Sequence, residues 1–158
     1  MGLQPTIRVQ REPFNAAAEA EALTAGRTDI GAVVTFTGLC RDEGGRLAEL
    51  DLEHYPGMAE NEIARVVDAT LQRWPLLGLA VVHRYGPIRP GEPIVLVVTT
   101  SSHRMAAFEA AEFLMDYLKS NAPFWKKELL AEGAEGDWVN AKREDEHALA
   151  RWQLNNIS

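Results

Sequence analysis

The stretch LGLAVVHRYGPIRPGEPIVLVVTT, Leu77–Thr100, contains two apolar runs with a turn-rich segment between them. The runs Leu77–Val82 and Ile94–Thr100 have the length and composition of strands. The segment Gly86–Gly91 reads GPIRPG, and clustered glycine and proline mark turns. We therefore expect two strands in the middle of the chain, separated by a turn.

The part of the chain before these strands alternates between strand and helix patterns. Helices are indicated by apolar residues at helical spacing or by a capping residue, and strands by β-branched composition or by period-two alternation. The expected helices are Ala16–Ala25, capped by Asn15, and Met58–Trp74, which Pro75 ends. The expected strands are Ile7–Val9, a buried strand at Gly31–Gly38, and a half-exposed strand from Arg46 with Ala48, Leu50 and Leu52 on one face.

The part after these strands begins with a long helix that Ser101 and Ser102 are expected to cap and Pro123 to end. Its apolar stripe is predicted to consist of Met105, Phe108, Ala111, Met115 and Leu118. Beyond it we expect a loop at Leu129–Gly136, a short strand at Trp138–Val139 and a terminal helix from Lys142. Because strands and helices follow one another irregularly, the sequence predicts an α+β fold rather than a doubly wound sheet, in a single domain of 158 residues.

The composition argues against several classes of protein. A formal charge of −7 repels a phosphate backbone, so we expect no general binding to nucleic acid. The single cysteine, Cys40, cannot form an internal disulfide, which fits a reducing compartment. The amino-terminal residues MGLQPTIRVQ lack the apolar run of a signal peptide, and no stretch approaches the roughly 20 apolar residues that cross a bilayer. We therefore expect a cytoplasmic protein that does not bind membranes.

No local motif predicts a metal or cofactor site. One cysteine and four dispersed histidines do not provide a zinc template; the histidines are His54, His83, His103 and His147. The chain also lacks the GxxxxGK[ST] and GxGxxG phosphate loops and the GxSxG nucleophile motif. We expect the protein to work without a resident metal or cofactor.

The segment Ser101–Lys127 concentrates the candidate functional residues, and its first residues suit an anion. Ser101–Arg104 (SSHR) opens a helix directly after a strand, where unpaired N–H groups and the positive end of the helix dipole are available. The cationic side chains of His103 and Arg104 oppose that dipole, and a bound anion would compensate them. The alternative is a solvated first turn without a ligand.

Lys119 and the segment Phe124–Lys127 (FWKK) follow at the other end of the same helix. Aromatic packing would desolvate Lys126 and lower its pKa, which makes a lysine useful near neutral pH. The alternative is that these lysines are solvated side chains that favour the dipole at the carboxyl end of a helix.

The length of this helix separates its two cationic ends. Arg104 and Lys119 are fifteen residues apart, which corresponds to roughly 22 Å along an unbroken helix. The two side chains cannot meet at one small substrate within a single protomer. If both serve one site, a second protomer of a symmetric dimer must supply one of them, and we predict such a dimer.

Five motifs, in this order, resemble the large, catalytic subunit of molybdopterin synthase. They are GAVVTFTG with a following arginine (Gly31–Arg41), LEHYPGM (Leu52–Met58), HRYG (His83–Gly86), SSHRMAAFEA (Ser101–Ala110) and MDYLKSNAPFWKKE (Met115–Glu128). The resemblance runs from about Ile7 to Trp152 and leaves residues 153–158 as a tail. The second and last motifs are long and idiosyncratic, so coincidence is a poor explanation.

This resemblance implies an α+β fold with a hammerhead-like arrangement, in which helices flank a mixed or antiparallel sheet. It also implies an enzyme that transfers sulfur to cyclic pyranopterin monophosphate (precursor Z) and so forms the dithiolene of molybdopterin. The sulfur would arrive as a thiocarboxylate on the carboxyl-terminal Gly-Gly tail of a small ubiquitin-like subunit. The implied assembly is a heterotetramer built on a dimer of the large subunit.

The resemblance also assigns roles to residues of this chain. Lys119 and Lys126 match the catalytic lysines of the family, and Arg41, His103 and Arg104 match its contacts to the substrate phosphate. Lys127 and Glu128 continue the pocket wall. Leu39, followed by Cys40, stands where the family usually has a lysine two residues before the arginine, so one cationic contact of the substrate site is missing. Lys142 replaces an arginine of the family, which keeps the charge but loses the bidentate fork.

Two other functions remain open at this point. The chain would be a non-catalytic module if it only bound a ubiquitin-like partner or an anionic metabolite. It would be a cysteine-dependent transferase if Cys40, beside Arg41, were an activated thiolate rather than a small residue near the end of a strand.

Within the sulfur-transfer hypothesis, the neutral fraction of Lys119 would also be able to attack the acyl carbon of the partner's tail, although sulfur transfer does not require this step.

Overall fold

The computed structural model describes residues 3–45, 47–121, 123–130, 135–138 and 149–152. The elements run in the order β1 (Thr6–Gln10), α1 (Ala16–Thr24), β2 (Ala32–Leu39), a 3₁₀ turn (Glu43–Gly45), β3 (Leu47–His54), α2 (Met58–Arg73), β4 (Leu76–Arg84), β5 (Gly86–Ile88), β6 (Pro93–Ser101), α3 (Arg104–Asn121), β7 (Phe124–Leu130) and β8 (Glu135–Trp138). The predicted α+β class is confirmed.

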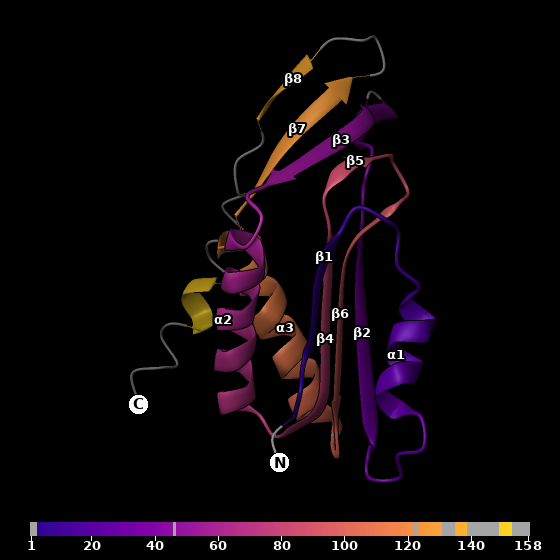
Figure 1. Cartoon of the computed structure of the whole chain (residues 1–158), viewed down its shortest axis with the longest axis vertical. Helices are drawn as coiled ribbons and strands as arrows, with labels where there is room; N and C mark the ends of the chain where they lie inside the picture. The colour runs from indigo at the N-terminus through magenta and orange to yellow at the C-terminus, as the bar shows by residue number, and fades with distance from the viewer. Residues whose placement is uncertain (1–2, 46, 122, 131–134, 139–148, 153–158) are drawn as a thin grey trace.

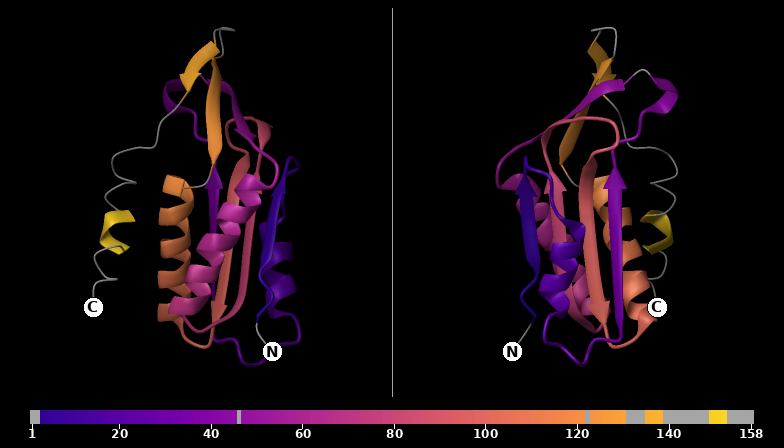
Figure 2. Two further views of the ribbon diagram at one scale, coloured as in Figure 1. Left: turned by 60° about the vertical axis from the view of Figure 1, so that its left-hand side comes forward. Right: turned by 90° about the vertical axis from the view of Figure 1, so that its right-hand side faces the viewer.

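Two four-stranded sheets form the framework. The first sheet has the strand order β1-β4-β6-β2, in which β1 pairs parallel with β4 and the other pairs are antiparallel. The second sheet has the order β5-β3-β7-β8 and is antiparallel throughout. Figure 1 shows the second sheet set across one end of the first, like the head of a hammer. Helices α2 and α3 cover one face of the first sheet and α1 covers the other, as Figure 2 shows from two more sides.

The first sheet is buried on both faces because its central strands are apolar at successive positions. Leu79 and Val81 of β4 pack toward α2 and α3, in one core with Leu114 of α3. The alternate residues Ala80 and Val82 pack toward α1. The central strands therefore form a rigid layer between the helices.

The chain turns a corner where the two sheets join, and the buried side chain of Arg84 stabilises this corner. The chain leaves β4 at Arg84, and β5 begins in the second sheet only two residues later. The Arg84 guanidinium donates to the carbonyl oxygens of Arg11 at 2.9 Å and Pro93 at 3.0 Å, and pairs with Glu92 at 3.1 Å. Arg11 follows β1, whereas Glu92 and Pro93 are adjacent residues at the start of β6, so one side chain ties two separate segments to the corner.

The predicted apolar stripe of the long helix is partly wrong. Met105 is 70% exposed and Phe108 is 60% exposed. The buried face of α3 instead consists of Ala107, Ala110, Ala111, Phe113, Leu114 and Leu118. Small alanines let the helix approach the sheet closely, and the large side chains near its start turn outward. The helical period indicates an apolar face but not which face the sheet takes.

The expected buried strand at Gly31–Gly38 is an edge strand. β2 pairs only with β6 among the described strands, and Val33 and Phe36 are 45% and 40% exposed. The β-branched pattern of this segment identified a strand correctly. It did not reveal that one side of the strand lacks a neighbour, because that depends on the topology of the sheet.

Two other boundaries also differ from the expectations. β7 continues to Leu130 and β8 begins at Glu135, so the predicted loop at Leu129–Gly136 is wrong at both of its ends. Ser101 is the last residue of β6, and its hydroxyl donates to the carbonyl of Pro75 at 3.0 Å, so it does not cap α3. Val139 and residues 142–148 of the expected terminal helix lie outside the described residues, and residues 149–152 are helical.

Candidate active site

Lys119 and Lys126 lie at the end of the first sheet that carries the second sheet. Lys119 is in the last turn of α3, which ends at Asn121, and β7 begins at Phe124. The left view of Figure 2 shows the upper end of α3 close to the base of β7. The structure thus places both lysines near the junction of the two sheets.

The register of β7 places Lys126 and Glu128 on the inward face of the second sheet. Lys126 pairs with Leu52 and Glu128 pairs with Leu50, and both leucines are buried. Successive strand residues point to opposite faces, so Lys127 points the other way. The resemblance implies that Lys127 and Glu128 continue one pocket wall; in β7 they are successive residues, so their side chains leave opposite faces of the strand.

Cys40 lies close to this inward face and is not an activated thiolate. Its side chain is 3% exposed. Burial raises the pKa of the thiol, and the charges of Glu92, Asp42 and Glu128 raise it further, while the charge of Lys126 acts in the opposite direction. A protonated, buried thiol is a poor nucleophile, so the interpretation of Cys40 as a small residue at the end of a strand is favoured. The neighbouring residues Leu39 and Arg41 are exposed.

Two histidines that the sequence left without a role contact the ring of Phe124, which lies two residues before Lys126 in β7. The rings of His83 and Phe124 stack with centroids 3.8 Å apart and planes at 10°. His54 is the strand partner of Phe124, and their rings lie 5.7 Å apart. His83 lies in the HRYG motif and His54 in the LEHYPGM motif, so the motifs pointed to both residues. Only the tertiary structure shows that the two histidines contact the same Phe124 ring.

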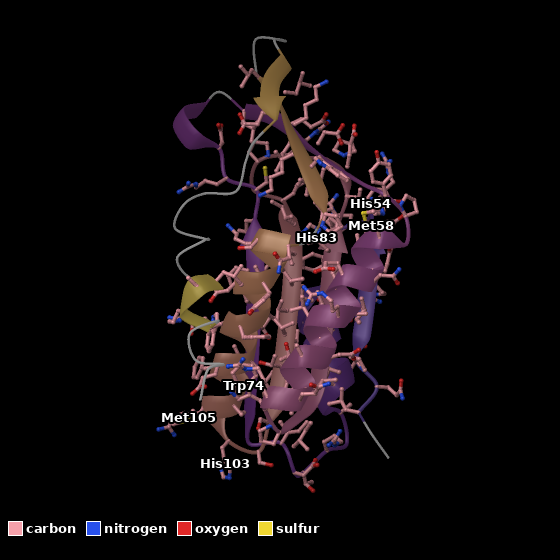
Figure 3. The ribbon with its side chains drawn as sticks, turned by 90° about the vertical axis from the view of Figure 1, so that its left-hand side faces the viewer. His54, Met58, Trp74, His83, His103 and Met105 are labelled. Carbon is pink, nitrogen blue, oxygen red and sulfur yellow. The ribbon has the colours of Figure 1, made fainter. Side chains whose placement is uncertain are left out.

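His103 and Arg104 lie at the opposite end of the fold. Figure 3 shows His103 and Met105 at one end of the molecule and His54 and His83 toward the other. Helix α3 is continuous from Arg104 to Asn121, so the expected separation of Arg104 and Lys119, roughly 22 Å, applies to this chain. Both His103 and Arg104 are exposed.

Arg41 also lies far from His103 in the same chain. β2 runs antiparallel to β6, with Ala32 opposite Ser101 and Leu39 opposite Pro93. The chain therefore travels the length of β2, about 23 Å for seven residues, between the His103 end and the Arg41 end. The three predicted phosphate contacts are divided within one protomer: Arg41 is at the lysine end and the other two are at the far end.

The His103 end contains a pocket of about 440 Å³. It is lined by Trp74, Pro75, Ser101, Ser102, His103, Met105, Ala106 and Glu109. The Glu109 carboxylate accepts a hydrogen bond from Trp74 Nε1 at 3.2 Å. The loop before α3 packs tightly against Gly31, where an added Cβ would lie 2.2 Å from the Ser102 carbonyl oxygen. Gly31 therefore allows the close approach that positions His103.

An exposed apolar surface lies beside this end, on β2 and the start of α3. It consists of Val33 and Phe36 from the edge strand and Met105 and Phe108 from the helix. β2 and α3 are in contact. Val33 and Phe36 are three residues apart in the edge strand, so their side chains leave opposite faces of the sheet. Large exposed apolar side chains on both faces of an edge strand are typical of an interface.

Within the described residues, no group of three or more His, Cys, Asp or Glu side chains has a metal-binding arrangement. None of the described helices is long and apolar enough to cross a membrane.

Comparison with known proteins identifies the family. The family model described as "MoaE protein" matches residues 9–121. The chain belongs to the MoaE family. It is 64% identical over 154 residues to the molybdopterin synthase catalytic subunit of Mesorhizobium japonicum, covering 98% of this chain and 97% of that protein.

Solved structures of MoaE proteins share the fold. The MoaE protein of Burkholderia ambifaria superposes with a TM-score of 0.81 at 45% identity, covering 95% of this chain and 99% of that one. A complex of subunits 1 and 2 of the molybdopterin-converting factor of Helicobacter pylori matches with a TM-score of 0.69 at 21% identity, covering 87% and 90%. The second likeness concerns the fold alone.

Proposed function

We infer that this protein is the catalytic, sulfur-transferring subunit of a molybdopterin synthase. The observation that carries this conclusion is the 64% identity to a molybdopterin synthase catalytic subunit over nearly the whole of both chains. The substrate that we propose is cyclic pyranopterin monophosphate, and the sulfur donor is the carboxyl-terminal thiocarboxylate of a small ubiquitin-like partner. The name of the Mesorhizobium japonicum relative, a catalytic subunit, supports the presence of a partner subunit.

We propose that Lys119 and Lys126 carry the chemistry. The reaction brings an anionic thiocarboxylate to a substrate that already carries a phosphate, so nearby cations must screen their repulsion. Lys126 suits this role because it is partly buried on the inward face of β7, beside buried Leu52. An ammonium group there also donates a proton to the oxygen that leaves as sulfur takes its place. As proposed, this transfer needs no resident metal or cofactor.

We further propose that the active site is completed by a second copy of this chain. Within one protomer, the lysines lie at one end of α3 and the candidate phosphate anchors His103 and Arg104 at the other. The exposed apolar surface of Val33, Phe36, Met105 and Phe108 lies beside the anchor end and would be covered by dimerisation. The dimer would place the anchors of one protomer near the lysines of its partner.

A reconstituted reaction tests the proposed function. The purified protein, supplied with thiocarboxylated partner and precursor Z, is expected to form molybdopterin. Lys119→Ala is expected to abolish product formation while circular dichroism and the thermal midpoint stay unchanged, because Lys119 is exposed and contributes little to the core. Full turnover by a correctly folded Lys119→Ala protein would contradict the lysine mechanism.

The cytoplasmic location stays a prediction that rests on the single cysteine.

A further inference from the structure

Phe124 connects the strand of Lys126 to both sheets through its ring contacts. His83, near the end of β4 in the first sheet, stacks on Phe124 with the rings nearly parallel. His54, the last residue of β3 in the second sheet, contacts the same ring. The ring centroid of Tyr85 lies 4.3 Å from that of His54. These contacts fix the first residue of β7 at the sheet junction.

Phe124 and Lys126 share one face of β7, because they are two residues apart. A strand advances about 3.3 Å per residue, so the two side chains leave the backbone about 7 Å apart. Lys126 therefore leaves β7 on the same face as the Phe124 ring that stacks on His83. The positive charge of Lys126 also lowers the pKa of His83.

The hydrogen bond of His83 identifies its tautomer. Nδ1 lies 2.8 Å from the carbonyl oxygen of Arg84. A carbonyl oxygen only accepts, so Nδ1 carries the proton and donates it. Burial lowers the pKa of His83 to about 4; the charges of Lys126 and His54 also lower it, while the hydrogen bond to Arg84 opposes the shift. At neutral pH the ring is therefore uncharged, and Nε2, on the opposite edge of the ring, carries no proton and acts as a hydrogen-bond acceptor.

The chemistry of the two groups is complementary. A lysine ammonium is only a donor, and the Nε2 of this tautomer is only an acceptor. A neutral acceptor stabilises a nearby ammonium, whereas a charged imidazolium would repel it. The groups near Lys126 include the Cys40 thiol, which burial keeps protonated, and the Glu128 carboxylate, which shares its face of β7.

We propose that His83 is a positioning residue for Lys126: the Phe124 stack and the Arg84 hydrogen bond hold it as a neutral imidazole whose Nε2 lone pair stabilises the Lys126 ammonium in the active site. The proposal rests on the catalytic role proposed for Lys126. It assigns a function to the HRYG motif, which the sulfur-transfer reaction otherwise leaves unexplained.

Nuclear magnetic resonance tests the proposal on the unmodified protein. The ¹⁵N shifts of the His83 ring are expected to show protonated Nδ1 and unprotonated Nε2 throughout the range from about pH 5.5 to 8. An imidazolium, or the tautomer with the proton on Nε2, at pH 7 would overturn the proposal. This measurement depends on neither activity nor substitution.

Two matched variants separate the lone pair from the ring stack. His83→Phe keeps an aromatic ring against Phe124 but removes the acceptor, whereas Phe124→Leu removes the stacked ring but keeps the acceptor. The chain has four lysines, Lys119, Lys126, Lys127 and Lys142, so their ¹³Cε signals can be followed individually. In His83→Phe the titration midpoint of Lys126 is expected to fall by about half a unit or more, with the other three unchanged.

The kinetic result separates positioning from packing. In His83→Phe we expect kcat to fall about tenfold with little change in KM, because the substrate's other contacts remain. His83→Gln, whose amide both donates and accepts, is the conservative control, and its Lys126 midpoint is expected to stay nearer the wild-type value. If His83→Phe folds poorly, the tautomer measured on the unmodified protein still decides the proposal. Unchanged kcat and an unchanged Lys126 midpoint in a folded His83→Phe protein would refute the proposal. Full activity of Lys126→Ala would instead refute the catalytic role of the lysine, whatever the state of His83.

Discussion

Mixing two inactive variants tests whether the active site is shared between protomers. Lys119→Ala removes a proposed chemical group, and Arg104→Ala removes a proposed phosphate anchor. These residues lie at opposite ends of continuous α3, roughly 22 Å apart, so one chain cannot bring both to a small substrate. In a dimer of one Lys119→Ala chain and one Arg104→Ala chain, one site receives both substitutions and the other receives neither.

The expected recovery follows from this geometry. A purified mixed dimer has one intact site out of two and is expected to show about half of the wild-type turnover. An equal mixture at random exchange contains mixed dimers as half of its population, so about a quarter of the wild-type turnover is expected to return.

The assay uses two different affinity tags, one on each variant, so that only mixed dimers survive consecutive purification. Molybdopterin formation is then measured with the thiocarboxylated partner and precursor Z, and the two parent homodimers, each confirmed to be folded, are the controls. A mixed dimer that is as inactive as its parents would refute the shared site. A protein that remains monomeric at assay concentration and is nevertheless active would refute it as well.

Three further predictions concern single residues. Cys40→Ser is expected to retain most of the turnover in the reconstituted assay, because the thiol is buried and its pKa is raised; loss of turnover by the folded variant would restore the cysteine mechanism. Lys127→Ala is expected to keep turnover within about twofold, since it points away from the inward face, and a loss as large as that of Lys126→Ala would show that the alternation of β7 does not govern the site. His83 has a folded-state pKa of about 4, below its ordinary value of 6.5, so the unfolded chain takes up the proton first as the pH falls. Its contribution to stability is present above pH 6.5 and is lost toward pH 4, by up to about 3 kcal/mol, so urea unfolding of His83→Phe is expected to show a smaller loss over this range than the wild type.

Local patterns predicted most of the secondary structure. The expected helix Met58–Trp74 matches α2 to within one residue, and Asn15 caps α1 through a hydrogen bond from the Ala18 amide at 3.0 Å. Such features are predictable because a cap or a helical period depends only on residues a few positions apart. The same patterns did not show that Phe108 faces outward, since burial depends on which element packs against the helix.

The candidate site was predictable in part for the same reason. The distance between Arg104 and Lys119 follows from helix length alone, so the sequence was enough to predict that one chain cannot unite them. The sequence did not show that Lys126 and Lys127 point to opposite faces, because this follows only once Phe124–Leu130 is known to be a strand. The meeting of His83, Phe124 and His54 depends on how two sheets join, because these residues are distant in sequence and only long-range packing brings their rings together. The amino-acid sequence alone therefore determined the residue types and their spacing along α3. The surroundings of Lys126 form only when β3, β4 and β7 pack together, so only the tertiary structure determined them.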